Sequence, residues 1–310
     1  MYVELRKAVN PQEYGGKAAS LARMLEISFN VPDGIAISTS DFRYFVDYTR
    51  VCQILKRTQG KFSLKDIELV TKFSEILALA FQREPMPKAL EVILKEIWAK
   101  VTPPVAVRSS AVGEDSAKDS FAGQGETVLN VSTYKDFVTA VRTVWTSAYT
   151  VRNIVYRAER NIPDPLVAIA VQAMVKADMA GVCFTKNPVN GDGMLVEVAK
   201  GSGEALVSGH VTPKKLTVGP LYKQVENVAN QLRVMFGCEL DIEFAVRDKV
   251  LYILQARPIT TEIAEKREAK GSMLLSGIAA SAGIVTGRVV KDYKKLLPGD
   301  VLVTSMTTPE

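Results

Sequence analysis

The 310-residue chain has few of the side chains that most often build reactive or metal-binding centres, because it contains one histidine and three cysteines. Cys52, Cys183 and Cys238 are odd in number and widely spaced, so they form neither a metal-binding motif nor a disulfide framework. We therefore expect free thiols in a reducing compartment, which predicts a cytoplasmic protein.

Long hydrophobic runs and a strong charge of one sign are also missing. No apolar run reaches the roughly 20 residues that span a membrane, and residues 1–10 lack the apolar core of a signal peptide. The net charge of +5 is mild and the basic residues are scattered, which is unlike a nucleic-acid-binding protein but compatible with small anionic ligands. We expect a protein that binds neither membranes nor nucleic acids.

The composition, 47% apolar and 24% charged, is that of a globular protein long enough for two or three compact units. Amphipathic periodicity predicts helices, and short apolar runs bounded by turn residues predict strands. The expected helices cover 15–29, 38–55, 63–82, 87–100, a pair across 134–160, and 221–236. The expected strands cover 31–37, 105–107, a run from 127, 166–175, 181–185, 193–199, 214–218 and a hairpin over 239–256.

The segment from Val105 to Val131 is the most informative part of the chain. A β-branched run ends in Arg108-Ser109-Ser110, and after a polar loop a turn containing Gly123 and Gly125 leads into a second apolar run. Glycines let backbone N–H groups approach an anion, and an arginine shares its charge with phosphate oxygens. The spacing is neither a Walker A loop nor a dinucleotide fingerprint. The residues alone leave a phosphate-holding loop and a flexible surface hairpin open.

Residues 241–257 predict a hairpin with one apolar and one polar face. A turn around Lys249 places Glu243 opposite Gln255. The same register places Asp241 opposite Arg257, and opposed Cβ atoms are about 5 Å apart, so the four side chains form one cluster. A carboxylate beside an amide oxygen suits Mg²⁺, and an adjacent arginine suits a terminal phosphate. A solvent-facing hairpin with a surface salt bridge is the alternative.

Residues 108–127, RSSAVGEDSAKDSFAGQGET, resemble the signature of the N-terminal ATP-binding domain shared by phosphoenolpyruvate synthase and pyruvate phosphate dikinase. Rifampicin phosphotransferase carries a similar domain. Other motifs match in the family's order, and with the signature they span most of the chain: Gly15–Leu21, Val31–Gly34, Asp241–Phe244 and Leu254–Pro258.

The resemblance implies an α+β, ATP-grasp-like fold in which two lobes clamp ATP. It implies an N-terminal helical lobe over 1–100 and a nucleotide-binding lobe over 101–260. A charged linker over 261–271 would then lead to residues 272–310, which resemble the incomplete start of a swivelling phosphohistidine domain. The single histidine, His210, lies in a polar turn of the ATP domain and is a poor phosphoryl acceptor.

In the family, this domain transfers the β-phosphoryl group of ATP to the histidine of the swivelling domain and releases AMP and phosphate. The group then passes to pyruvate at a third domain. The order of segments and the loop at 120–124 favour the pyruvate, water dikinase (phosphoenolpyruvate synthase) branch. The resemblance thus implies an incomplete phosphotransferase whose partners are ATP and a phosphohistidine domain in cis or in trans, with pyruvate bound only by missing domains. The alternatives are a pyruvate phosphate dikinase or rifampicin phosphotransferase-like ATP domain, or a stand-alone ATP-binding regulatory module.

The resemblance also implies site residues. Taken alone, Lys17 is an exposed lysine and Met174 a core residue; in the family, the matching positions bind nucleotide. Glu197 would meet the ribose or bind metal. The implied set comprises Lys17, Arg108 and Arg257 at the phosphates as catalytic residues; Gly123, Gln124 and Thr127 in a lid loop; Gln172, Met174 and Val175 at the adenine; and Glu243 and Gln255 as ligands of Mg²⁺.

Overall fold

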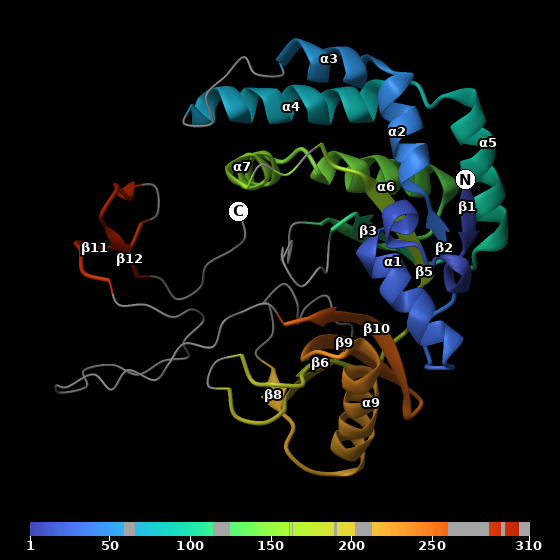
Figure 1. Cartoon of the computed structure of the whole chain (residues 1–310), viewed down its shortest axis with the longest axis vertical. Helices are drawn as coiled ribbons and strands as arrows, with labels where there is room; N and C mark the ends of the chain where they lie inside the picture. The colour runs from blue at the N-terminus through green and yellow to red at the C-terminus, as the bar shows by residue number, and fades with distance from the viewer. Residues whose placement is uncertain are drawn as a thin grey trace. The chain divides into compact units, whose positions relative to one another are not determined.

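The computed structural model describes residues 1–58, 66–113, 125–160, 162, 164–188, 191–201, 213–259, 285–292 and 295–303 (Figure 1). The chain divides into two units. The large unit comprises Met1–Lys186 and Gly193–Thr260, and the small unit comprises Asn187–Asp192 and Thr261–Glu310. The large unit contains all the described residues of the predicted site.

Two five-stranded sheets, in which every strand pair is antiparallel, form the framework of the large unit. The first sheet has the order β1-β2-β5-β3-β4, with β1 at Tyr2–Glu4, β2 at Gly34–Ile37, β3 at Val105–Ala111, β4 at Thr127–Val131 and β5 at Val167–Ala173. The second has the order β10-β9-β6-β7-β8, with β6 at Met179–Phe184, β7 at Leu195–Lys200, β8 at Lys214–Lys215, β9 at Leu240–Arg247 and β10 at Val250–Pro258. Strands β1 and β2 come before residue 100 and β3, β4 and β5 come after it, so the first sheet contains residues of both predicted lobes. The predicted domain boundaries stay predictions.

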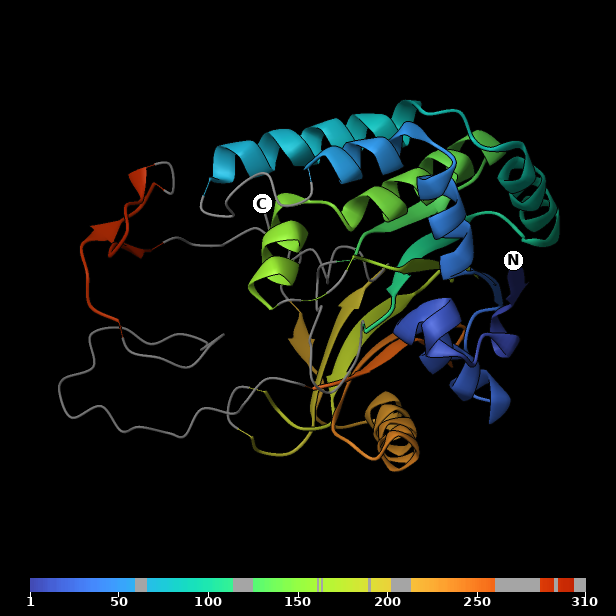
Figure 2. The same ribbon diagram turned by 45° about the horizontal axis from the view of Figure 1, so that its top comes forward.

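The helices between residues 39 and 159 cover one face of the first sheet (Figure 2). The helices are α2 at Thr39–Asp47, α3 at Arg50–Thr58, α4 at Ile67–Arg83, α5 at Lys88–Lys100, α6 at Tyr134–Ser147 and α7 at Val151–Glu159. The apolar sides of α2 to α6 and the β-branched residues of β2, β3 and β5 form one buried core, in which the Phe45 ring lies 5.4 Å from that of Phe81 and 5.3 Å from that of Trp145. This core fixes the strand that carries Arg108.

A second core holds the short 3₁₀ helix η1 at Leu5–Lys7, α1 at Pro11–Glu26 and α9 at Pro220–Phe236 against the second sheet. Helix α1 contacts β3 and β5 of the first sheet as well as β10 of the second. Small side chains, Ala36 and Ala170, face α1 on the first sheet and leave room for it. Helix α1 is therefore packed against both sheets.

The predicted elements are mostly present, but several bounds differ: the helix expected over 15–29 covers Pro11–Glu26, and the strand expected over 214–218 covers Lys214–Lys215. Ser38 caps α2 in a reciprocal capping box with Asp41, but the helix expected up to residue 55 ends at Asp47 and a second helix begins at Arg50. The strand expected from residue 31 begins at Gly34. The edge strand β1 was not predicted, since three residues are too short for a periodic signal.

The final hairpin pairs Glu243 with Gln255 and Asp241 with Arg257, as predicted, but a two-residue turn and a β-bulge produce this register instead of a turn centred on Lys249. The turn contains two residues, Asp248 and Lys249, both left-handed, and pairs Arg247 with Val250. That register alone would place Glu243 opposite residue 254. A β-bulge between residues 253 and 255 absorbs one residue and restores the predicted pairing.

The small unit contains a pair of parallel strands, β11 at Val289–Val290 and β12 at Val301–Leu302. Arg288 binds Asp300 through two hydrogen bonds of 3.0 and 2.7 Å, at exposed positions beside the strands. The phosphohistidine-like start over 272–310 lies largely outside the described residues and stays a prediction. Among the helices that the structure describes, none is long and apolar enough to cross a membrane.

Candidate functional site

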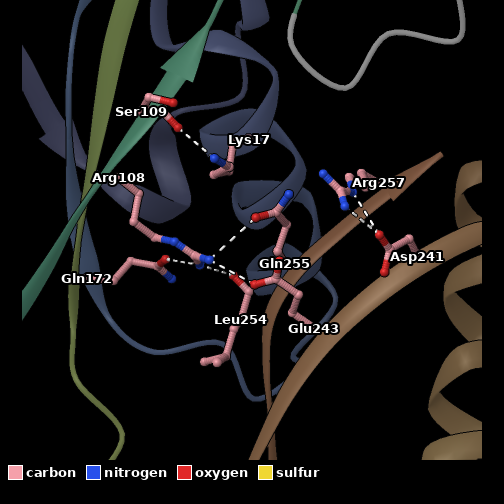
Figure 3. Close-up of polar contacts among 9 residues, drawn as sticks. All are labelled: Lys17, Arg108, Ser109, Gln172, Asp241, Glu243, Leu254, Gln255 and Arg257. Carbon is pink, nitrogen blue, oxygen red and sulfur yellow. Dashed lines mark hydrogen bonds and ion pairs between the residues drawn. The ribbon is translucent and has the colours of Figure 1, made fainter. Parts of the chain in front are cut away.

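Arg108 connects the two sheets of the large unit (Figure 3). From β3, its Nη2 donates to Glu243 Oε2 at 3.0 Å and its Nη1 donates to the Leu254 carbonyl oxygen at 2.7 Å. Longer hydrogen bonds of 3.4 Å reach the Oε1 atoms of Gln172 and Gln255. Leu254 is the bulge residue, so the irregularity in β10 presents the carbonyl that Arg108 binds.

Two hydrogen-bond donors at this junction are unsatisfied. Arg108 Nε and Gln172 Nε2 are buried and have no hydrogen-bond partner within the described part of the chain. The side chain of Arg108 is 12% exposed, so water satisfies these groups poorly. Buried donors without partners beside an arginine are what an anionic ligand requires, and a phosphate offers acceptor oxygens to both.

Lys17 lies against the strand that carries Arg108. Its Nζ donates to the Ser109 carbonyl oxygen at 2.9 Å, and the residue is only 5% exposed. The hydroxyl of Ser110 donates to the Tyr14 carbonyl at 2.7 Å and accepts from the Ala18 N–H at 2.9 Å, which fixes the start of α1 on β3. The reading of Lys17 as an exposed lysine is therefore wrong, and two motifs some 90 residues apart in sequence are neighbours.

Asp241 and Arg257 form a partly buried ion pair. Arg257 donates from Nε at 2.9 Å and from Nη2 at 2.7 Å, both to Asp241 Oδ2. Asp241 is 9% exposed, which contradicts the alternative of a solvent-facing surface salt bridge. Burial raises the pKa of the Asp241 carboxyl, and the neighbouring Arg257 only partly offsets this effect. The second carboxylate oxygen, Oδ1, is buried without a partner among the described residues.

Glu197 shares a face of the second sheet with Glu243. The register pairs Glu197 with Val182 and Val182 with Glu243, so the three side chains form one row across β7, β6 and β9. The two glutamates are two strands apart, roughly 10 Å between Cα atoms. Glu197 thus faces the same side as Glu243 and Gln255 without joining their cluster.

The other predicted residues lie around this junction to different degrees. Thr127 is directly opposite Arg108 on the neighbouring strand β4. Gln172 is the second-last residue of β5 and contacts Arg108, and the Met174 N–H just beyond the strand donates to the Pro104 carbonyl at 3.1 Å. Val175 follows, half-buried. Three further positions, Gly123, Gln124 and His210, lie outside the described residues.

Sequence reasoning missed two contributors. The Leu254 carbonyl depends on a bulge that has no sequence signal. Ser110 was identified only as part of the signature motif, although its hydroxyl makes two hydrogen bonds to the backbone of α1. The available signal for Ser110 was its position two residues after Arg108, because alternate residues of a strand face the same side.

Oxygen atoms suited to Mg²⁺ gather at the hairpin. Glu243 Oε2, Gln255 Oε1 and the partnerless Asp241 Oδ1 belong to three neighbouring positions of β9 and β10. No group of three or more acidic, cysteine or histidine side chains in the described ranges could hold a metal by itself. The donor set therefore fits a Mg²⁺ ion that keeps waters and takes further oxygens from a phosphate.

The Asp241→Asn variant is expected to keep or gain stability while losing affinity for Mg-ATP. A raised pKa means that the folded state disfavours the charged carboxylate once the pH exceeds its ordinary pKa, so a neutral amide relieves that cost at neutral pH. The amide oxygen still accepts from Arg257, but the negative charge for a cation is gone. Thermal unfolding and calorimetric titration would check both parts, and unchanged affinity would remove Asp241 from the site.

Comparisons with known proteins show which family the sequence matches. The family model described as "Pyruvate phosphate dikinase, AMP/ATP-binding domain" matches residues 12–222 and 220–275. A "Probable phosphoenolpyruvate synthase" of Archaeoglobus fulgidus is 32% identical over 361 aligned residues, covering 96% of this chain and 48% of the relative. One of Methanocaldococcus jannaschii is 31% identical over 362 residues, covering 96% and 30%. The chain spans half or less of the length of these relatives.

The comparison with solved structures includes a distant likeness. The structure of Cdc123 from Schizosaccharomyces pombe matches with a TM-score of 0.36 and 10% identity, over 82% of this chain and 85% of that one. A likeness of this size supports no argument about function or site.

Proposed function

Since the chain belongs to the family of the pyruvate phosphate dikinase AMP/ATP-binding domain, we propose that its two sheets bind Mg-ATP for phosphoryl transfer in a phosphoenolpyruvate synthase-like enzyme. The observation that carries the proposal is the convergence at Arg108. Arg108 on the first sheet binds Glu243 and Gln255 on the second, and two buried donors, its own Nε and Gln172 Nε2, have no partner among the described residues. An ATP-grasp-like clamp of two lobes is the arrangement that this convergence favours.

The acidic and amide side chains would bind the metal, and the basic side chains would bind the phosphates. Glu243, Gln255 and Asp241 would hold Mg²⁺, which neutralises phosphate charge when bound. Arg108, Lys17 and Arg257 would bind phosphate oxygens, so that catalysis rests on positioning and on charge already in place before reaction. Nucleotide binding would exchange the contacts of Arg108: its hydrogen bonds to Glu243 and Gln255 would be replaced by bonds to phosphate.

The base and the ribose would lie beyond β5. Gln172, Met174 and Val175 lead out of β5 and would line the adenine slot, with Glu197 at the ribose or at the metal. Gly123, Gln124 and Thr127 would form the loop that covers the phosphates. Of these, Thr127 is supported by its place opposite Arg108.

The phosphoryl acceptor would be a histidine on a separate domain, joined in cis or supplied in trans. From that histidine the group would pass to pyruvate, bound by further domains. The relatives named phosphoenolpyruvate synthase are longer than this chain, which supports that division of labour.

A cytoplasmic location is supported by the free thiols of Cys52, Cys183 and Cys238. Burial raises the pKa of Cys183 to about 12, so its thiol is inert.

Calorimetric titration of ATP with Mg²⁺ tests the proposal. The wild type is expected to show saturable, Mg²⁺-dependent binding, and a Glu243→Ala, Arg257→Ala double variant is expected to lose it. An Arg247→Ala variant is the matched control, because Arg247 lies on the same hairpin at a half-exposed position remote from Arg108. Binding that is independent of Mg²⁺, or equal in the double variant, would contradict the assignment of the hairpin.

Transfer is tested separately, with a purified phosphohistidine domain of a phosphoenolpyruvate synthase and ATP labelled at the β-phosphate. Label on the histidine domain would support an enzymatic role. Binding of ATP without transfer to that domain would instead favour a regulatory module.

A further inference from the structure

A pocket lies in the large unit, where the corner between α6 and α7 meets the end of β3 and the start of β5. Its volume is about 250 Å³. Ser109 and Ala111 line it from β3, and they alternate with Arg108 and Ser110, which face α1 and the second sheet. Ser109 and Ala111 thus face the pocket from the side of β3 opposite to Arg108, and Gln12 at the start of α1 also lines it.

The wall of this pocket is mostly apolar. Aliphatic groups come from β3, from the end of α6 and from the segment before β5: Ala111, Val112, Ala148, Leu166 and Val167. Among the described lining residues there is one cation, Arg157, and one anion, the exposed Asp164. This volume is below the ~300–1,000 Å³ typical of ligand pockets and limits the occupant to a small molecule.

Arg157 is the unusual member of the lining. Its Nη1 donates to the Ala148 carbonyl at the end of α6 at 2.5 Å, and its guanidinium lies 5.7 Å from the centre of the Tyr149 ring. No carboxylate in the described segments lies within ion-pair distance of it. Burial lowers the pKa of Arg157, more than Tyr149 and Asp164 raise it. The positive charge at the pocket is thus incompletely balanced.

We propose that this pocket binds a small monocarboxylate with an apolar body. The carboxylate would accept hydrogen bonds from the remaining donors of Arg157, and the body would pack on Ala111 and Leu166. Asp164 and the carbonyl end of α6 are negative, so a multiply charged phosphate is disfavoured and one negative charge is preferred. Binding there does not depend on the proposed function.

A ligand in this pocket would affect the proposed nucleotide site through β3, which borders both. The Ser109 carbonyl accepts from Lys17, and Gly125 of the lining precedes Thr127, which is opposite Arg108. The ligand would therefore change the affinity for Mg-ATP. This consequence, unlike binding itself, rests on the proposed function.

The test uses 3-phenylpropionate as the probe and 3-phenylpropan-1-ol as its uncharged counterpart, titrated into the wild-type chain without nucleotide. We expect saturable binding of the acid that is about tenfold tighter than that of the alcohol, because a charge-assisted hydrogen bond is lost. No saturation, or equal affinity for acid and alcohol, would overturn the proposal. This comparison needs no variant and does not depend on ATP binding.

Two variants locate the site. Arg157→Met is expected to remove the preference for the acid while retaining the alcohol, whereas Arg152→Met, an exposed arginine on the same helix, should change neither. Ala111→Phe fills the pocket and should abolish binding of both molecules. Acid binding that persists unchanged in a folded Arg157→Met or Ala111→Phe protein would place the ligand elsewhere and refute the assignment. A titration of Mg-ATP at saturating acid then reports the coupling alone.

Discussion

Replacing Arg108 with alanine is expected to weaken Mg-ATP binding by roughly 100-fold or more, because each charge-assisted hydrogen bond contributes about 1.5–3 kcal/mol. The same change should lower stability, since Glu243 is only 19% exposed and loses its cation. Calorimetric titration and urea denaturation measure the two effects. An Arg108→Ala protein that binds Mg-ATP like the wild type would remove the observation on which the proposed function rests.

The Arg108→Lys variant separates charge from geometry. Lysine keeps the positive charge, but one ammonium group replaces a planar fork that serves Glu243, the Leu254 carbonyl and the two amide side chains. We expect it to recover most of the stability and only part of the affinity, which leaves roughly a tenfold deficit. Full recovery of affinity would show that charge alone is required at this position.

A second substitution distinguishes the structural from the binding role of Arg108. In an Arg108→Ala, Glu243→Gln protein the stranded carboxylate is gone, so the free energy of unfolding should rise again towards that of the wild type. Mg-ATP affinity should stay low, because both the phosphate ligand and the charged metal ligand are missing. If affinity returned together with stability, the loss in Arg108→Ala would be a folding effect.

The final hairpin shows how far the sequence predicts the site. Alternation of polar and apolar residues, together with an assumed turn around Lys249, was sufficient to pair Glu243 with Gln255. The same alternation could not reveal the bulge at Leu254, since a turn one residue longer gives the same pairing at residues 241–243 without it. The contact between Leu254 and Arg108 therefore required the structure.

Lys17, by contrast, is a site residue whose buried position the sequence did not predict. Lysine is rarely buried, so no local pattern predicts that its ammonium group lies against the Ser109 carbonyl. The family resemblance implies that Lys17 lies at the phosphates, and the packing of α1 on β3 places its ammonium group beside Ser109, next to Arg108 in the strand. Contacts between residues so distant in the chain depend on the whole fold rather than on local propensity, and the sequence alone did not contain a signal for them.

Helix α1 makes the link between these two parts of the site. Ser110 fixes its first turn to β3, and Ser20 donates to the Ala256 carbonyl of β10 at 2.9 Å, directly before Arg257. One helix thus sets the spacing between the strand of Arg108 and the strand of Gln255 and Arg257. The residue that lets α1 approach β3 so closely should then have a large effect on both stability and binding.

That residue is Gly15, and Gly15→Ala is expected to lower the free energy of unfolding by roughly 3–5 kcal/mol. Gly15 has a φ of +74°, a left-handed conformation that disfavours any side chain. A Cβ atom there would lie 1.9 Å from the Ser110 carbonyl oxygen, so α1 must move away from β3. Because α1 carries Lys17, Mg-ATP affinity should fall as well. Urea denaturation and calorimetric titration measure the two losses.

Gly237→Ala is the matched control, because its φ of +70° is nearly the same but a Cβ atom would meet nothing within 4 Å. Gly237 ends α9, and the substitution should cost only the left-handed strain of about 1–2 kcal/mol and leave Mg-ATP affinity unchanged. The difference between the two variants therefore isolates the close approach of α1 to β3 from backbone strain. Equal losses in both would mean that α1 can shift on β3 at no cost, and the spacing of Arg108 and Lys17 would then have to be set by other contacts.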